Sequence, residues 1–193
     1  MPRPIRLSVL LLAACTLSAP AHAGDAMRFG ISPSVSAFHL KDPDGPTANG
    51  SAFTPLSGLL IASAGRDARV LVHVQYDDFS VPASTTDIGE NVTRLGGDVS
   101  YQILFRLSRA WKPWGGIGLG YAGEHYTTRY TLTPGGHLAS QYPDRSASSV
   151  ALVVNTSTEW RLERDWSMGA QLQYEQALGN GASALRFGLY LVY

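Results

Sequence analysis

The sequence predicts an all-β chain that folds as an eight-stranded antiparallel up-and-down transmembrane β-barrel. Apolar side chains recur at every second position through most of the chain, which is the period of a strand. The last nine residues, 185–193, place Leu, Phe or Tyr at every odd position and end on Tyr193, while Arg186 and Gly188 lie on the other face. The closing strand of an outer-membrane barrel has this pattern, because one face meets lipid and the other a polar interior.

A secretory signal at the other end of the chain agrees with a location in the outer membrane. Residues 1–23 run from two arginines through an apolar stretch to an Ala-x-Ala cleavage site, so we expect cleavage between Ala23 and Gly24. The barrel domain is then residues 24–193. The stretch ending at Cys15 also fits a lipoprotein cleavage box, in which Cys15 would carry the lipid. A barrel needs no lipid anchor, so cleavage after Ala23 is favoured, and the mature chain then has no cysteine for a disulfide.

Composition limits the kinds of partner that the chain can bind. The whole chain has a formal net charge of zero, and removal of Arg3 and Arg6 with the signal leaves −2. With no basic stripe, nucleic acid is excluded as a partner. No apolar run after the signal reaches the ~18 residues of a membrane-spanning helix. We expect no cofactor.

Eight strands follow from the alternation, each near the roughly ten residues that cross a bilayer when tilted. They are expected at 27–37, about 53–64, 69–76, 94–107, 116–124, 149–162, 166–175 and 185–193. The register of the second is uncertain, because Leu59, Leu60 and Ile61 break the alternation. An even number of strands puts both termini on one side and lets the first strand pair with the last.

Loop lengths give the orientation. Long polar loops are expected at 41–51, 77–92 and 129–147, with a moderate one at 176–182, and short turns lie between them. Barrels of this kind have short periplasmic turns and long extracellular loops.

Aromatic residues are expected at both membrane boundaries, where a ring with a polar edge is favoured. The periplasmic set is Trp111, Trp114, Trp160, Trp166 and Tyr193, and the outer set is Tyr76, Tyr121 and Tyr174.

Periodicity alone does not say which face is inside, since a soluble lipocalin-like barrel alternates with the same period. The secretion signal, the aromatic terminal strand and the abundance of Gly and Ser on the polar face favour the membrane barrel. A solvated outer face would carry more than the two lysines of this chain, Lys41 and Lys112, both in loops or turns.

With its Gly-Gly-Ile-Gly-Leu-Gly-Tyr segment (115–121) and terminal strand, the chain resembles the small bacterial outer-membrane barrels typified by the OmpA transmembrane domain, OmpX-like and opacity-type proteins. The resemblance implies recognition of the C-terminal strand by the barrel-assembly machinery, surroundings of outer-membrane lipid and lipopolysaccharide, and a monomer.

The predicted inward charges form a polar network. They are Arg28, Arg69, Arg94, Asp98, Arg106, Glu124, Glu159, Arg161, Glu175 and Arg186. Buried charges persist when they are paired, and eight strands leave an interior that side chains just fill. We therefore expect a salt-bridged plug, with Glu175 as a partner of Arg186. A narrow channel for small solutes is the alternative.

Enzymatic and metal sites have weaker support. Outer-membrane lipid A deacylases present a His-x-Ser pair and a carboxylate, and the nearest match here is His125-Tyr126-Thr127. Asp77, Asp78, Asp87 and Glu90 in the second long loop could gather a divalent cation, and a solvated loop is favoured for them. We expect a non-enzymatic barrel that serves envelope integrity or surface interaction through its outer loops.

Overall fold

The computed structural model describes residues 27–193 except 42, 46–47, 109–110 and 164. The predicted signal peptide, Cys15 and the Ala23–Gly24 junction lie outside the described residues. No helix in the described part of the chain is long and apolar enough to cross a membrane.

The described residues form eleven antiparallel strands in a single sheet. The strands are β1 (Arg28–Ile31), β2 (Ser34–Leu40), β3 (Ala48–Thr54), β4 (Gly58–Ser63), β5 (Ala68–Val81), β6 (Gly89–Leu104), β7 (Trp114–Leu132), β8 (Leu138–Tyr142), β9 (Arg145–Arg161), β10 (Ser167–Ala177) and β11 (Ser183–Val192).

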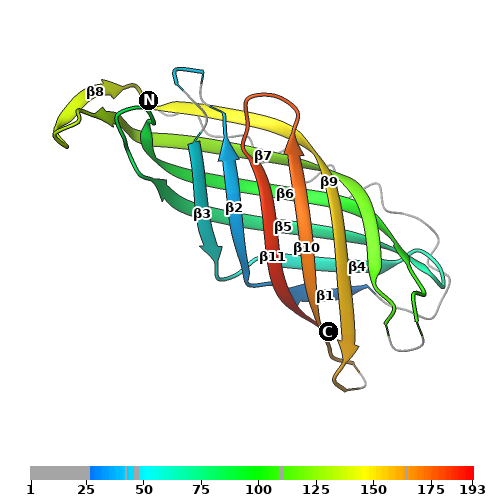
Figure 1. Cartoon of the computed structure of the whole chain (residues 1–193). Helices are drawn as coiled ribbons and strands as arrows, with labels where there is room; N and C mark the ends of the chain where they lie inside the picture. The colour runs from blue at the N-terminus through cyan, green and yellow to red at the C-terminus, as the bar shows by residue number, and fades with distance from the viewer. Residues whose placement is uncertain (1–26, 42, 46–47, 109–110, 164) are drawn as a thin grey trace.

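These strands make a ring of eight, as the sequence predicts (Figure 1). β1 and β2 are two parts of one spanning strand, because both pair with β11 in one register: Gly30 with Val192 and Ser34 with Gly188. β3 and β4 share another position, and β8 is an outlying strand paired only with β7. The last strand therefore closes the barrel on the first.

A bulge separates β3 from β4 and explains the irregular pattern of the second spanning strand. Even-numbered residues such as Thr54 face inward in β3, whereas odd-numbered residues such as Leu59 face inward in β4. One extra residue between Thr54 and Ser57 makes this change of face. Since strand periodicity is read over consecutive residues, such an insertion disrupts the alternation at that point.

The apolar face of the sheet points outward. Ile117 on β7 is 71% exposed, whereas Gln102 on the adjoining β6 is 1% exposed and points inward. A belt of exposed Leu, Val, Ile, Phe and Tyr surrounds the ring, and the interior is mainly polar. This arrangement excludes the lipocalin-like alternative, whose apolar side chains would fill the inside.

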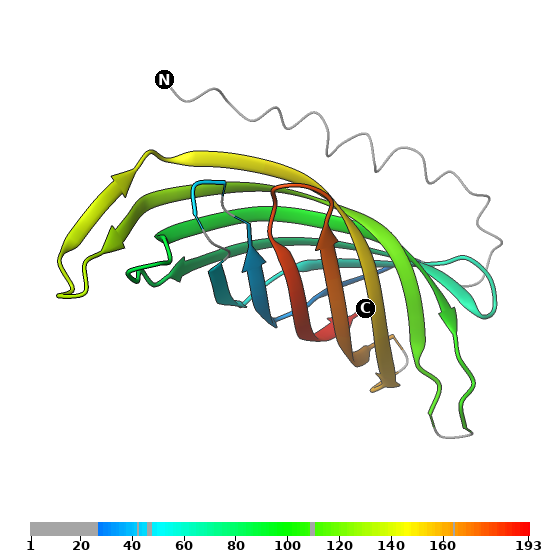
Figure 2. The same cartoon turned by 45° about the horizontal axis from the view of Figure 1, so that its top comes forward.

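The long loops predicted by the sequence are mostly strand. β5 and β6 extend to Val81 and from Gly89, so the second loop is only residues 82–88. Likewise, β7 pairs with β8 and then β9 to make one hairpin that projects past the rest of the ring (Figure 2). Backbone pairing continues beyond the membrane because it needs no apolar face, whereas the alternation that marks a strand in the sequence ends there.

The barrel depends on close approach of neighbouring strands at the glycines of β7. A Cβ on Gly118 would lie 2.2 Å from the carbonyl oxygen of Val99, on β6. By contrast, a Cβ on Gly123 of the same strand would have nothing within 4 Å.

We predict that Gly118→Ala lowers the free energy of unfolding by about 1–3 kcal/mol, the usual cost of overpacking. The matched Gly123→Ala variant should change it by less than about 1 kcal/mol. Urea unfolding in lipid vesicles, followed by tryptophan fluorescence, measures both. Equal stability of the two variants would contradict the packing explanation.

One joint in the ring lacks a backbone ladder. Within the described residues, no strand pairing joins β3 to the outer half of β5, although Thr54 donates a hydrogen bond to Asp77 between them. Toward the extracellular end, the outward-facing residues change from Phe53 to Ser51 on β3 and from Tyr76 to Asp78 on β5. The joint therefore lies at the outer edge of the apolar belt and beyond it. Water can reach its backbone groups there, which lipid would not satisfy.

We predict that amides of β3 exchange with deuterium at least about tenfold faster than those of residues 116–122 in β7, which is paired on both sides. Exchange measured residue by residue by NMR in micelles tests this. Protection of β3 equal to that of β7 would mean that β3 and β5 are paired in solution.

Candidate functional site: the barrel interior and its two ends

The centre of the barrel contains a network of buried charges around Arg94. Its Nη2 lies 2.5 Å from Glu175 Oε2, its Nη1 3.4 Å from Asp77 Oδ2 and its Nε 3.4 Å from Glu124 Oε1. All four side chains are at most 4% exposed. They come from β5, β6, β7 and β10, so the network joins opposite walls of the barrel.

Arg186 on the closing strand completes this network. It donates to Glu175 Oε1 at 2.8 Å and to Asp77 Oδ2 at 3.3 Å, and its Nε donates to Ser36 Oγ at 2.9 Å. The carboxylates of Asp77 and Glu175 are thus each shared by the guanidinium groups of Arg94 and Arg186. Paired charges of this kind persist in a narrow interior because each is satisfied by an opposite charge.

A Ser-His-Asp constellation lies next to the network, on the periplasmic side. His73 Nε2 is 2.9 Å from Ser57 Oγ, and its Nδ1 is 3.5 Å from Asp98 Oδ2. A nucleophilic serine must give its proton to histidine. Here Ser57 donates its proton to the Ser32 carbonyl at 2.5 Å, so His73 must be the donor toward Ser57. The three side chains are also buried.

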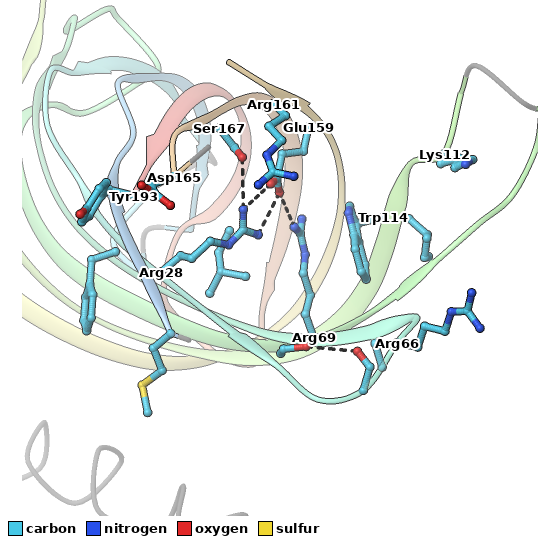
Figure 3. A pocket seen from close by; sticks show the side chains of 17 residues that line it. Arg28, Arg66, Arg69, Lys112, Trp114, Glu159, Arg161, Asp165, Ser167 and Tyr193 are labelled. Atoms are coloured by element: carbon cyan, nitrogen blue, oxygen red, sulfur yellow. Dashed lines mark hydrogen bonds and ion pairs between the residues drawn. The ribbon is translucent and has the colours of Figure 1, made fainter. Parts of the chain in front are cut away.

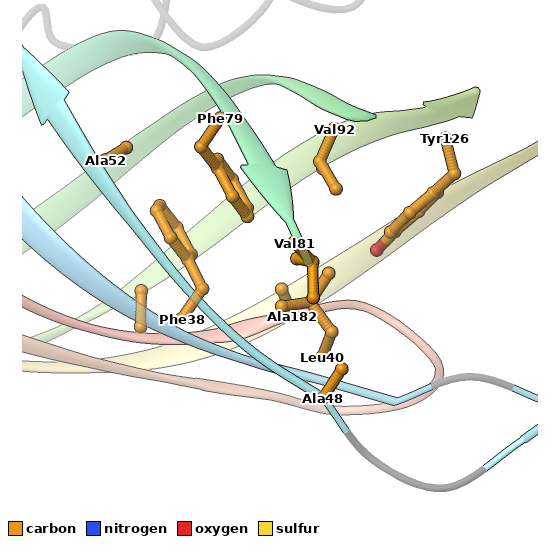
Figure 4. Packing of buried hydrophobic residues seen from close by; sticks show 10 residues of the cluster. Phe38, Leu40, Ala48, Ala52, Phe79, Val81, Val92, Tyr126 and Ala182 are labelled. Carbon is orange, nitrogen blue, oxygen red and sulfur yellow. The ribbon is translucent and has the colours of Figure 1, made fainter. Parts of the chain in front are cut away.

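An apolar cluster lies on the extracellular side of these charges, and Figure 4 shows its packing. The rings of Phe38 and Phe79 stack with centroids 4.4 Å apart, and Leu40, Val92 and Tyr126 pack around them. This layer places buried apolar side chains in the outer half of the barrel.

A second set of charges ties the outer segments together. Buried Arg129 donates to Glu90 at 3.1 Å, to Asp44 at 3.0 Å and to the Pro143 carbonyl at 2.8 Å. Arg145 lies over the Tyr126 ring, 3.6 Å from its centroid. The first extracellular turn, the start of β6 and the projecting hairpin are therefore joined over the mouth.

The periplasmic end is different, because it is open. A cavity of about 890 Å³ enters the barrel between the short turns (Figure 3). At its inner end Glu159 accepts hydrogen bonds from Arg28 and from Arg69, the latter at 2.8 Å. Arg69 also lies over the Trp114 ring, 4.2 Å from its centroid. We call this cavity the vestibule.

The structure places most of the predicted inward charges inside the barrel. Arg69, Arg94, Asp98, Glu124, Glu175 and Arg186 are buried, Arg28 and Glu159 line the vestibule, and Arg161 is at its rim. Arg106 is a correction: it is exposed in the turn after β6 and pairs with Asp67, 2.5 Å away. The strand ends at Leu104, so alternation no longer sets the direction of its side chain.

The aromatic residues occupy the expected levels, with one correction. Trp111, Trp160, Trp166 and Tyr193 are exposed at the periplasmic end, and Tyr76, Tyr121 and Tyr174 are exposed toward the other. Trp114 instead points into the vestibule (Figure 3). Its even number puts it on the same face of β7 as Gly116 and Gly118, so alternation could have identified this.

The residues considered for metal binding and catalysis do not assemble into a site. Asp77 and Asp78 lie on opposite faces of β5, Asp87 accepts from Ser84, and Glu90 pairs with Arg129. No group of three or more His, Cys, Asp or Glu that could hold a metal ion occurs in the residues that the structure covers. His125 Nδ1 lies 2.9 Å from Ser146 Oγ across the β7–β9 pair, a partner that its local sequence does not reveal.

The closed ring, the outward apolar belt and the charged interior define the class of this protein: a small transmembrane β-barrel with the fold of bacterial outer-membrane proteins. No family model and no curated protein matches the sequence.

Two solved structures with TM-scores above 0.5 show the same fold. Neisserial surface protein A is 12% identical, with a TM-score of 0.54, over 87% of this chain and 98% of that chain. The outer membrane protein OprG from Pseudomonas aeruginosa is 11% identical, with a TM-score of 0.52, over 87% and 93%. Ail, the attachment invasion locus protein of Yersinia pestis, is 13% identical, with a TM-score of 0.49, over 88% and 99%.

We predict that Glu175→Gln lowers the free energy of unfolding by about 3 kcal/mol, because it removes one partner of a buried ion network. Asp67→Asn breaks the exposed pair with Arg106 and should cost less than about 1 kcal/mol. Urea unfolding in lipid vesicles compares them. A Glu175→Gln barrel as stable as the wild type would show that the network contributes specificity and no net stability.

Proposed function

We propose that this chain is a non-enzymatic, non-conducting outer-membrane barrel that supports the integrity of the envelope and makes surface contacts through its extracellular hairpin. The observation that carries the proposal is the filled interior. The Arg94–Glu175–Arg186 network and the apolar cluster above it occupy successive levels, and both consist of buried side chains. The vestibule therefore ends inside the barrel and does not continue to the extracellular side.

The projecting hairpin supports the second half of the proposal. β7 has 19 residues and β9 has 17, whereas about ten residues are enough to cross the membrane. The remainder is held in shape by pairing between β7 and β8, for example Tyr130 with Gln141. A rigid extension costs less conformational entropy on binding than a flexible loop does.

We predict that the purified wild-type barrel shows no discrete conductance steps in planar lipid bilayers. The Arg94→Ala/Glu175→Ala/Phe79→Ala variant, which removes a matched charge pair and side-chain volume from both levels, should show frequent openings. Arg106→Ala/Asp67→Ala is the control, because it removes an exposed pair outside the interior. Heat-modifiable mobility in gels shows which variants are folded. Reproducible openings of the wild type would favour the narrow-channel alternative.

The hairpin is tested in cells that express a variant with residues 130–141 replaced by Asn-Gly. The barrel should remain folded and should still restore resistance of a deletion strain to detergent. Adherence of the cells to epithelial monolayers should fall to that of the deletion strain. Undiminished adherence would contradict a role of the hairpin in surface contacts.

A further inference from the structure

The vestibule concentrates positive charge, although the chain as a whole has no net charge. Five basic side chains and two acidic ones line it, which leaves an excess of three positive charges. The basic residues are Arg28, Arg66, Arg69, Lys112 and Arg161, and the acidic residues are Glu159 and Asp165. A cleft with one sign of charge between low-dielectric walls raises the local concentration of the opposite ion.

The imbalance is greatest at the inner end of the vestibule. Glu159 is shared by two guanidinium groups, with Arg69 Nη1 at 2.8 Å and Arg28 Nη2 at 3.3 Å. One carboxylate balances only one of these charges. The Arg69 side chain is 3% exposed, so water does little to stabilise it, while that of Arg28 is 32% exposed and reaches the cavity.

These groups are held in position before any ligand arrives. Arg69 donates to Gln102 Oε1 at 2.6 Å and to Ser157 Oγ at 2.8 Å, and its guanidinium lies over Trp114. Figure 3 shows Arg28, Arg69 and Arg161 converging on Glu159 from different strands. Planar guanidinium groups present paired donors that fit phosphate oxygens, and fixed donors lose little entropy on binding.

We propose that the vestibule is a binding site for phosphate-bearing anions at the periplasmic end of the barrel. Its volume of about 890 Å³ is in the range of pockets that bind small molecules. Arg28 and Arg161 supply the accessible charge, and Arg69 supplies a fixed charge behind them. The phosphate belongs either to a soluble anion or to the headgroup of an anionic phospholipid, because lipid-facing Phe29 and Tyr193 form part of the rim.

The test is a calorimetric titration of the full barrel, folded in phosphatidylcholine nanodiscs, with inorganic pyrophosphate. We expect saturable binding that weakens as salt is added. Arg28→Gln/Arg161→Gln should lose at least about tenfold in affinity, and Glu159→Gln should gain affinity because it removes the competing carboxylate. Arg106→Gln, at the same end but outside the vestibule, should bind like the wild type.

A second arm identifies the source of the phosphate. Native mass spectrometry of barrels released from phosphatidylglycerol nanodiscs should show one retained lipid on the wild type and on Arg106→Gln, and none on the double variant, if the headgroup is the ligand. Pyrophosphate binding without a retained lipid assigns a soluble anion. The proposal is overturned if neither binds, or if the folded double variant binds like the wild type. Conductance does not enter this test, so its failure leaves the proposed function untouched.

Discussion

The structure depends on closure of the ring between β11 and the β1–β2 strand. In lipid, an unpaired backbone amide or carbonyl has no water to bond, so a sheet that crosses a membrane must have no edge there. The pairing of Ser34 with Gly188 and of Gly30 with Val192 removes that edge along the whole span. The one joint without a ladder, β3 against outer β5, lies where the apolar belt gives way to polar residues and water replaces the missing partners.

Closure with eight strands also determines what the inside contains. The ring is narrow, so side chains meet across it, and glycines of β7 leave room where strands approach closely. Six of the predicted inward charges are buried there, and Arg94 and Arg186 each reach both Asp77 and Glu175. Such pairs balance charge that the interior could not solvate. The same side chains that pair with one another also fill the interior.

The sequence predicts the eight-stranded ring, its closure and the two faces, because alternation is a local property and the even number of strands follows from counting the alternating segments. Prediction from the sequence fails where the local pattern no longer indicates strand position or side-chain direction. Polar strand extensions past the membrane look like loops, as in residues 129–147, and the bulge after Thr54 changes the inward face. Pairs such as Ser57 with His73 depend on the register between distant strands, which no single segment specifies. Trp114 was predictable from its even position, whereas the turn conformation that exposes Arg106 was not.

The two ends of the barrel differ in how their charges are satisfied. At the extracellular mouth, Arg129 is surrounded by Glu90, Asp44 and a backbone carbonyl, so its charge is used to hold segments of this chain together. In the periplasmic vestibule, Arg28 and Arg69 share one carboxylate, and the part-exposed Arg28 reaches the open cavity. A locked mouth favours stable shape at the cell surface, while an excess of charge in an open cavity favours binding of a mobile anion. The two ends of the barrel thus differ in whether their arginine charges are balanced by this chain's own groups.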